Sequence, residues 1–235
     1  MVPGLVWVFT ALGFHPLHLT HIAIGTSLAT IVVTGTTSAW AHHKRQAVQW
    51  RLAFRLVPGI IIGALIGALF ADSLSSDHLR QLFGVLQIIL ALKLLLNLSP
   101  QQGQFTPHNG EMPAVGTIIG AVASSMGIGG GALTGPYLIF RGQAVRHAVA
   151  TASAVGVPIA IAGAIGFIFT GLNATNLPRF SSGYVYWPAF AGISLATLIF
   201  APMGARLAHY LNPSVLKKAF AVLLIIIGIK MLAGW

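Results

Sequence analysis

The residues best suited to chemistry are four glycines within five positions, flanked by hydroxyl side chains. The stretch reads Ser-Ser-Met-Gly-Ile-Gly-Gly-Gly from position 124 to 131, and a threonine follows at position 134. Each glycine inside a helix costs about 1 kcal/mol relative to alanine, so the sequence predicts two half-helices around an unwound turn. The second half-helix, starting near Ala132, would direct free N–H groups and its positive dipole end toward an anion. The candidate anion ligands are Ser124, Ser125, Gly127, Gly129, Gly130, Gly131 and Thr134.

Glycines can instead serve close helix packing, which favours small residues at four-residue spacing. That spacing occurs at Gly59, Gly63 and Gly67, where we expect packing. For the cluster at 127–131 we expect binding, with packing as the alternative. Thr26, Ser27, Thr151 and Ser153 lie at related positions in uncharged helices and could face the same site. The alternative for these four is a hydrogen bond back to the preceding helical turn.

Histidine is frequent, with nine residues against three carboxylates. His21 and His147 stand at equivalent positions at predicted helix starts, where a titrating imidazole could couple proton movement to anion movement. The alternative is that both are interfacial residues without such a role. His15, His18 and His21 share a three-residue spacing, but no cysteine or carboxylate stands nearby, so we expect no metal site.

All three carboxylates fall in predicted loops. We therefore expect no intramembrane acidic residue for a proton relay and no acid/base pair for hydrolysis. An intramembrane hydrolase using Ser124 or Ser125 with His147 would lack an orienting carboxylate. The glycine stretch partly resembles a nucleotide-binding loop, but no strand precedes it, so we expect neither a cofactor nor an enzyme.

The composition places these residues in a membrane. Hydrophobic residues make up 56% of the chain and charged residues 7%, with a mean hydropathy of +0.84. Several apolar runs reach the roughly 20 residues that span a bilayer as a helix, and none shows the alternation of a barrel strand. The sequence predicts an all-α, polytopic membrane protein. The net charge of +10 lies mainly at helix ends, which favours orientation in a membrane over nucleic-acid binding.

The chain contains two copies of one unit. Eight of 17 positions are identical between 79–95 and 216–232, and the same offset pairs Trp50 with Trp187. A second offset pairs His21 with His147. We expect a first repeat over residues 1–98, a cytoplasmic linker over 99–112 and a second repeat over 113–235. Met1 aligns opposite Thr134, so we expect the first repeat to lack its start, a further half-helix ending in glycines.

The uncharged stretch from 113 to 140 is too long for one upright crossing and is predicted to be re-entrant. Each complete repeat then has about three spanning helices plus this broken segment, and the second repeat is inverted. In that arrangement ten basic residues face the cytoplasm and three face outside, as the positive-inside rule prefers. The ten are Lys44, Arg45, Arg51, Arg55, Lys93, Arg141, Arg146, Arg206, Lys217 and Lys218.

Two stretches of the second copy carry a resemblance: Met-Gly-Ile-Gly-Gly-Gly-Ala-Leu-Thr-Gly-Pro-Tyr-Leu, and His-Ala-Val-Ala-Thr-Ala-Ser-Ala soon after. With Ala-Ile-Gly-Thr-Ser-Leu-Ala of the first copy, they resemble the sulfite exporter TauE/SafE family of bacterial membrane permeases. The resemblance implies a multi-pass carrier in the bacterial plasma (inner) membrane for sulfur-containing oxyanions such as sulfite or organosulfonates. Family members normally carry a glycine-rich segment in each half, whereas this sequence has only the one at 127–131.

We therefore expect a transporter that moves a small anion by alternating access through a site near the midplane of the bilayer. The half-helix ends of the glycine segment and the polar faces around Thr26 and Ser153 would form this site. Its partners are the anion and the surrounding lipid, with no nucleic acid. A passive anion channel is the alternative function.

Overall fold

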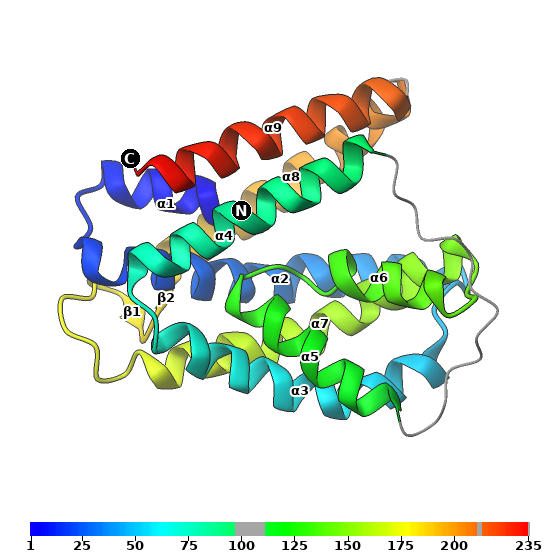
Figure 1. Ribbon diagram of the computed structural model, residues 1–235, viewed down its shortest axis with the longest axis horizontal. Coiled ribbons are helices and arrows are strands. Elements are labelled where there is room, and N and C mark those ends of the chain that lie inside the picture. Colours follow the sequence, from blue (N-terminus) through cyan, green and yellow to red (C-terminus); the bar gives the residue numbers. More distant parts are fainter. Residues whose placement is uncertain (97–110, 211–212, 235) are drawn as a thin grey trace.

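The structure, a computed structural model, describes residues 1–96, 111–210 and 213–234. This part of the chain is almost entirely helical (Figure 1). The helices are α1 (Val2–Ala11), α2 (Leu19–Lys44), α3 (Trp50–Asp72), α4 (Ser76–Leu95), α5 (Glu111–Ser125), α6 (Gly131–Phe140), α7 (Val145–Thr170), α8 (Trp187–Tyr210) and α9 (Pro213–Ala233). A 3-10 turn, η1 (Pro16–His18), precedes α2, and a short hairpin, β1 (Ser181–Ser182) and β2 (Val185–Tyr186), precedes α8.

Within the described residues, three helical segments are long and apolar enough to cross a membrane: Pro16–Lys44, Trp50–Asp72 and Val145–Thr170. Helices α1 and α6 are equally apolar but only ten residues long, half of what a crossing needs. The prediction of an all-α polytopic membrane protein is confirmed. Most of the linker predicted at 99–112 lies outside the described residues, and its last two residues begin α5.

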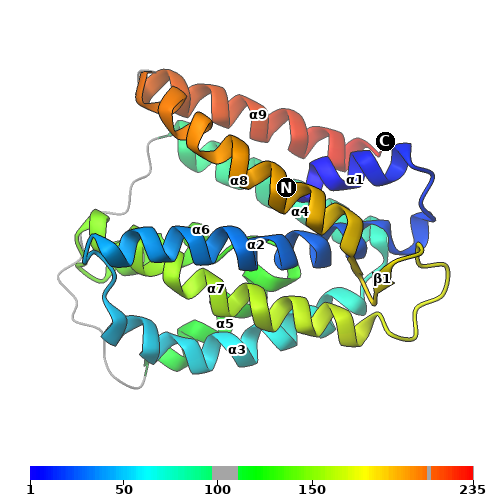
Figure 2. The ribbon, with the colours of Figure 1, turned by 180° about the vertical axis from the view of Figure 1, so that it is seen from behind.

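Helices α1 to α4 and α6 to α9 repeat one another with inverted direction. Helices α2 and α7 are equivalent, run in opposite directions and pack together, and so do α4 and α9 (Figures 1 and 2). Helix α3 packs on α7 as α8 packs on α2, and α1 packs on α2 as α6 packs on α7. Helix α1 starts in the middle of the molecule and runs to the end opposite the one that α6 reaches.

The glycine segment is re-entrant, as predicted. Helix α5 runs from one end of the molecule to its middle, and α6 returns to the same end (Figure 1). An ion pair between Glu111, the first residue of α5, and Arg141, which follows α6, joins the two helices at that end. The Arg141 guanidinium also lies over the Tyr137 ring, 5.7 Å from its centroid. We call this end, where α2, α4 and α6 finish, the basic end, because most of the basic residues that flank these helices lie there.

The glycines spaced by four residues on α3 form the contact with α5. A Cβ at Gly59, Gly63 or Gly67 would collide with the backbone carbonyls of Pro113, Thr117 and Ala121, respectively. Gly116 and Gly120 of α5 approach the α3 backbone in the same way. The packing predicted for the α3 glycines is confirmed, and it sets the position of the half-helix that ends in the glycine loop.

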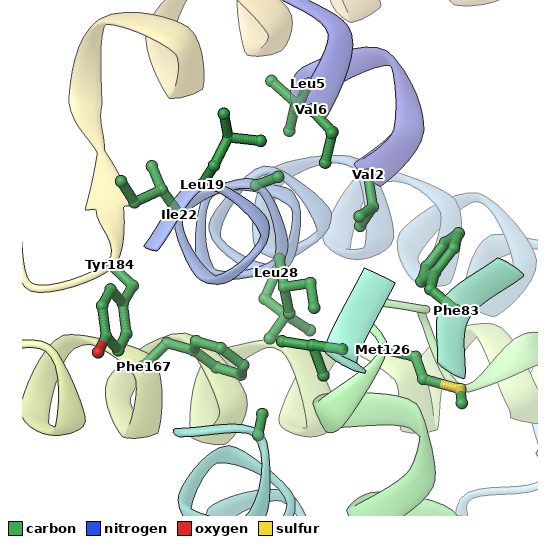
Figure 3. Close-up of a cluster of buried hydrophobic side chains, with 14 of the residues drawn as sticks. Val2, Leu5, Val6, Leu19, Ile22, Leu28, Phe83, Met126, Phe167 and Tyr184 are labelled. Carbon is green, nitrogen blue, oxygen red and sulfur yellow. The ribbon is translucent and has the colours of Figure 1, made fainter. Parts of the chain in front are cut away.

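Helix α2 passes through the centre of the core. Every residue from Leu19 to Thr30 is buried. In Figure 3, side chains of α1 and α7, with Phe83 of α4 and Met126 beyond α5, surround this part of α2. At the end opposite the basic end, the ring of Phe9 in α1 stacks on that of Phe14, and the Tyr186 ring meets both edge-on. Any hydroxyl on the first half of α2 is thus held away from bulk water.

Candidate functional site

The loop between α5 and α6 contains a glycine in a backbone conformation that other residues rarely adopt. Gly127 has a φ of 61°, in the left-handed region. Its N–H donates to the Ser124 carbonyl at 3.1 Å, and the Ile128 N–H donates to the Ala123 carbonyl at 2.9 Å. This pair of bonds is the Schellman ending of a helix, and it turns the chain sharply after Ser125.

Helix α6 then starts with donors that the protein leaves free. The Gly130 carbonyl accepts from the N–H groups of Leu133 and Thr134, at 3.3 and 2.8 Å. Within the described residues, the N–H groups of Gly129 and Gly130 have no acceptor. The first turn of α6 is reachable from the surface, because Gly131 is exposed. The loop therefore presents backbone donors and the positive end of the α6 dipole together.

Two hydroxyls beside this loop are buried without a hydrogen-bond partner in the part of the chain that the structure describes. They are Ser124 Oγ, in the last turn of α5, and Thr134 Oγ1, in the first turn of α6, and both residues are fully buried. An unpaired buried hydroxyl costs about 1–3 kcal/mol. Such a cost is offset where a bound ligand accepts the hydrogen bond, which suits an oxyanion at the loop.

The loop lies against the facing helices α2 and α7. Ser27 of α2 donates its Oγ–H to the Gly127 carbonyl at 3.1 Å. A Cβ at Gly130 would lie 2.6 Å from Ile159 Cδ1 and 3.4 Å from the Gly156 backbone, both near the middle of the 26-residue α7. Ser124 Oγ lies 2.7 Å from the position of a Cβ at Gly163, one helical turn further on. The loop thus lies against the middle of α7.

Two other predicted site residues hold helix starts in place. Thr26 Oγ1 accepts the Tyr186 N–H at 3.0 Å, and Thr151 Oγ1 accepts the Gln49 N–H at 3.0 Å. These amides directly precede α8 and α3, the equivalent helices of the two repeats. Ser125 and Ser153 donate to the carbonyls of their own preceding turns. The structure therefore brings Ser27, Ser124 and Thr134 to the loop and gives Thr26, Thr151 and Ser153 other partners.

The two equivalent histidines tie the start of α2 to the end of α3, and the start of α7 to the α2–α3 connection, at opposite ends of the molecule. His21 Nε2 lies 2.9 Å from the Ala71 carbonyl, and His147 Nδ1 lies 2.9 Å from the Ala47 carbonyl. Since a carbonyl only accepts, these nitrogens carry the hydrogen. His147 lies sixteen residues before Gly163, which packs on Ser124, and this is about 24 Å along α7 at 1.5 Å per residue. The structure therefore does not bring His147 to Ser124.

An apolar hollow of about 460 Å³ lies between α2, α3 and α7 toward the basic end. Its lining is mostly aromatic and aliphatic, including Trp40, Trp50, Phe54 and Val157. Such a surface offers an anion few hydrogen bonds in exchange for its hydration. The glycine loop remains the better candidate for anion binding. Within the described residues, no group of three histidine or acidic side chains could hold a metal ion.

A polar contact that the sequence analysis missed lies at the end opposite the basic end. Asp72, expected in a loop, is the last residue of α3 and accepts the Tyr184 Oη–H at 2.8 Å. His18 Nδ1 lies 3.4 Å from the same Oη. Burial and the bond to Asp72 raise the pKa of Tyr184 above its usual range. The two bonded residues are 112 positions apart, so no local pattern could have paired them.

Comparisons with known proteins cover almost the whole chain. A family model described as "Sulfite exporter TauE/SafE" matches residues 1–231. A "probable membrane transporter protein" of Haemophilus influenzae is 34% identical over 98% of this chain and 88% of its own length. The probable membrane transporter protein YdhB of Bacillus subtilis is 25% identical over 97% and 91%. A probable membrane transporter of Methanocaldococcus jannaschii is 24% identical over 89% and 78%. No solved structure gives a significant match.

Proposed function

Because this chain belongs to the sulfite exporter TauE/SafE family, and is therefore a membrane transporter, we propose that it carries small sulfur-containing oxyanions such as sulfite and organosulfonates. The observation that supports this most directly is the loop between α5 and α6. There, within the described residues, the N–H groups of Gly129 and Gly130 have no acceptor, and the adjoining turns of α5 and α6 carry two buried hydroxyls without a partner. A tetrahedral or pyramidal oxyanion has several acceptor oxygens and can use donors that converge from different directions.

The donors at the loop are dipoles, and this suits a carrier. The N–H groups, the hydroxyls of Ser124 and Thr134 and the α6 dipole stabilise negative charge only partly. The protein then binds the anion with only moderate affinity, so the anion can be released on the other side of the membrane. The Gly130–Ile159 contact leaves little space beside the loop, which favours small anions.

The inverted repeats support alternating access as the mechanism. The loop lies where α2 and α7, the equivalent helices of the two repeats, face each other. Rocking of one repeat against the other about this contact would expose the loop first to one side and then to the other. We place the protein in the bacterial inner membrane, with its basic end in the cytoplasm according to the positive-inside rule.

His21 and His147 are the proposed points of proton coupling, since imidazole titrates near neutral pH. His147 links the start of α7 to the α2–α3 connection of the other repeat, and His21 links the start of α2 to the end of α3 in its own repeat. A change in the charge of either ring would alter these contacts.

The test is flux of labelled sulfite and labelled methanesulfonate into proteoliposomes that contain the purified protein. We expect uptake of at least one of them that saturates with concentration and exchanges with unlabelled anion inside. Flux equal to that of empty liposomes for several sulfur oxyanions would exclude the proposed substrates. Discrete conductance steps in planar bilayers would instead support a passive channel.

A further inference from the structure

An apolar groove runs from the basic end along α3 and α7. Helices α2 and α3 both pack on α7, and the hollow of about 460 Å³ lies between them (Figure 2). A second hollow, of about 290 Å³, continues along α3 and α7, and Pro158 lines both. We call the two hollows together the α3–α7 groove. Its lining extends on α3 from Trp50 to Leu65 and on α7 from Ala154 to Ile165.

The length of this groove suits a lipid chain. Ile61 follows Trp50 by eleven residues, which is about 16 Å along α3 at 1.5 Å per residue. The hydrocarbon of one leaflet is about 15 Å thick, half of the bilayer core. The groove therefore reaches from the basic end to about the depth at which an acyl chain ends.

The polar groups inside the groove already have partners. Thr36 donates its Oγ1–H to the Val32 carbonyl at 2.6 Å, and Trp50 donates its Nε1–H to His43 Nδ1 at 3.1 Å. The lining of the second hollow is entirely aliphatic. The interior thus offers no free hydrogen-bonding group to a polar ligand, and it suits hydrocarbon.

The mouth of the groove, by contrast, has free donors within five residues of α2. Because His43 Nδ1 accepts a hydrogen bond, the neutral ring carries its hydrogen on Nε2, and His43 is exposed. Trp40 is 60% exposed, and within the described residues its Nε1–H has no acceptor. Lys44 Nζ lies 5.6 Å from the centroid of the Trp40 ring. A negatively charged group at this mouth meets an ammonium group and two N–H donors.

The positive charge around the mouth is not neutralised by the protein. Four basic residues stand one or two positions after lining residues: Lys44, Arg45, Arg51 and Arg55. Within the described residues, none of the four pairs with a carboxylate. Asp72 and Asp77 lie at the opposite end, and Glu111 pairs with Arg141. The ligand that complements this surface is therefore apolar over one leaflet and anionic at the basic end.

We propose that the α3–α7 groove binds one anionic phospholipid. One acyl chain lies in the groove, and the phosphate accepts hydrogen bonds at the mouth from His43 Nε2–H and the Lys44 ammonium group. With the basic end in the cytoplasm, the lipid comes from the cytoplasmic leaflet, where anionic lipids are available. Binding of the lipid does not depend on which anion the protein transports.

A lipid in this groove contacts both repeats. The linings on α2 and α3 belong to the first repeat and the lining on α7 to the second. A ligand that binds this arrangement and not the unfolded chain stabilises it. We therefore expect the melting temperature of the purified protein to rise with added phosphatidylglycerol, and to rise less with phosphatidylcholine of the same chains.

The binding test is native mass spectrometry of the purified full chain with increasing amounts of either lipid. Phosphatidylcholine has the same chains but no net charge on its headgroup. We expect one bound phosphatidylglycerol, held about tenfold or more tightly than phosphatidylcholine. Equal affinity for the two lipids would overturn the proposal.

Two pairs of variants separate the headgroup from the chain. One basic residue beside an anionic headgroup contributes about fivefold in affinity, so Lys44→Gln should weaken phosphatidylglycerol binding about fivefold. Lys93→Gln, at the same end but on α4, is its control. Thr36→Phe should fill the groove and abolish tight binding. Thr37→Phe is its control, because Thr37 is equally exposed, bonds back to its own helix as Thr36 does, and does not line the groove.

The same measurements distinguish other occupants. Unchanged phosphatidylglycerol affinity in both Lys44→Gln and Thr36→Phe would overturn the proposal. Glycerol phosphate that competes as well as the whole lipid would show a site for free phosphate. A wild-type dimer without lipid, together with a monomeric Thr36→Phe, would show that a second copy of the chain covers the groove.

Tryptophan fluorescence tests the position of the lipid in a bilayer. The protein is placed in phosphatidylcholine vesicles with a small fraction of phosphatidylglycerol whose chains carry bromine, a quencher. A lipid bound in the groove lies against Trp40 and Trp50, so quenching should exceed the share of brominated lipid in the membrane. Lys44→Gln should lose this excess and Lys93→Gln should keep it. Quenching that follows only the bulk share of brominated lipid would overturn the proposal, whatever the flux of sulfur oxyanions.

Discussion

Gly130 lies at the start of α6, where an added Cβ would force neighbouring side chains to shift. A Cβ there would lie 2.6 Å from Ile159 Cδ1 and 3.3 Å from Thr134 Oγ1. Overpacking of this kind costs about 1–3 kcal/mol. Here we expect it to distort the backbone of the loop. We expect Gly130→Ala to reduce methanesulfonate flux about tenfold or more, while the protein still inserts and purifies. Gly192→Ala is the control, because a Cβ at Gly192 meets nothing within 4 Å. Full flux in Gly130→Ala would show that the loop is not part of the transport site.

The two unpaired hydroxyls allow binding to be separated from folding. Removing a buried hydroxyl that has no partner should relieve part of its desolvation penalty of about 1–3 kcal/mol. Ser124→Ala should therefore leave the melting temperature unchanged or raise it, and at the same time weaken anion exchange. Thermal unfolding and exchange are measured on the same preparation. A lower melting temperature with normal exchange would show that Ser124 has a structural role instead.

At the residue scale, local features could be predicted and distant pairs could not. The free hydroxyls of Ser124 and Thr134 lie beside the glycines in sequence, so their place at the loop follows from the chain itself. The partners of Thr26 and Thr151 come from segments more than 100 residues away. Asp72 follows an apolar run and begins the polar-rich stretch Asp-Ser-Leu-Ser-Ser-Asp, a pattern that predicts a loop and contains no information about the distant Tyr184.

At the scale of elements, the equivalent contacts of the two repeats should have equal energies. Thr26 and Thr151 each accept the N–H that precedes a long helix, at 3.0 Å in both cases. Valine in place of threonine keeps the shape and removes the acceptor, which leaves the amide of a partly buried residue unpaired, at a cost of up to about 1–3 kcal/mol. We expect Thr26→Val and Thr151→Val to lower the melting temperature by similar amounts.

A matched control for this pair is available on α2. Thr30 is fully buried, and its hydroxyl only donates back to the Thr26 carbonyl of its own helix. That carbonyl also belongs to the helical ladder, so Thr30→Val should have a smaller effect. A melting temperature equally low in Thr30→Val would mean that the loss of any buried hydroxyl, and not of the amide partner, causes the change.

Most of the elements follow from periodicity and glycine placement. Uncharged runs identify the long helices, and adjacent glycines identify the break between α5 and α6, because both properties are local. The internal match identifies α4 and α9 as equivalent, whereas their packing against each other is seen only in the structure. The β1–β2 hairpin was not predicted. It has two residues in each strand, too few for a recognisable alternation.

At the scale of the whole molecule, the distribution of basic residues determines the orientation in the membrane. The α2–α3 and α6–α7 connections carry Arg45 and Arg141, the adjoining helix ends carry Lys44 and Arg146, and both connections lie at the basic end. The connection between α7 and β1, at the opposite end, contains Arg179 alone among basic residues. Since positively charged connections remain in the cytoplasm, the α7–β1 connection should face outward.

The chain has no cysteine, so single cysteines can report this orientation directly. Ala144, between α6 and α7, and Thr175, between α7 and β1, are both exposed. In intact cells a membrane-impermeant maleimide should label Thr175→Cys, and it should label Ala144→Cys only after the membrane is opened. Labelling of both positions in intact cells would contradict a fixed inverted topology. The reversed pattern would place Asp72, Tyr184 and His18 on the cytoplasmic side.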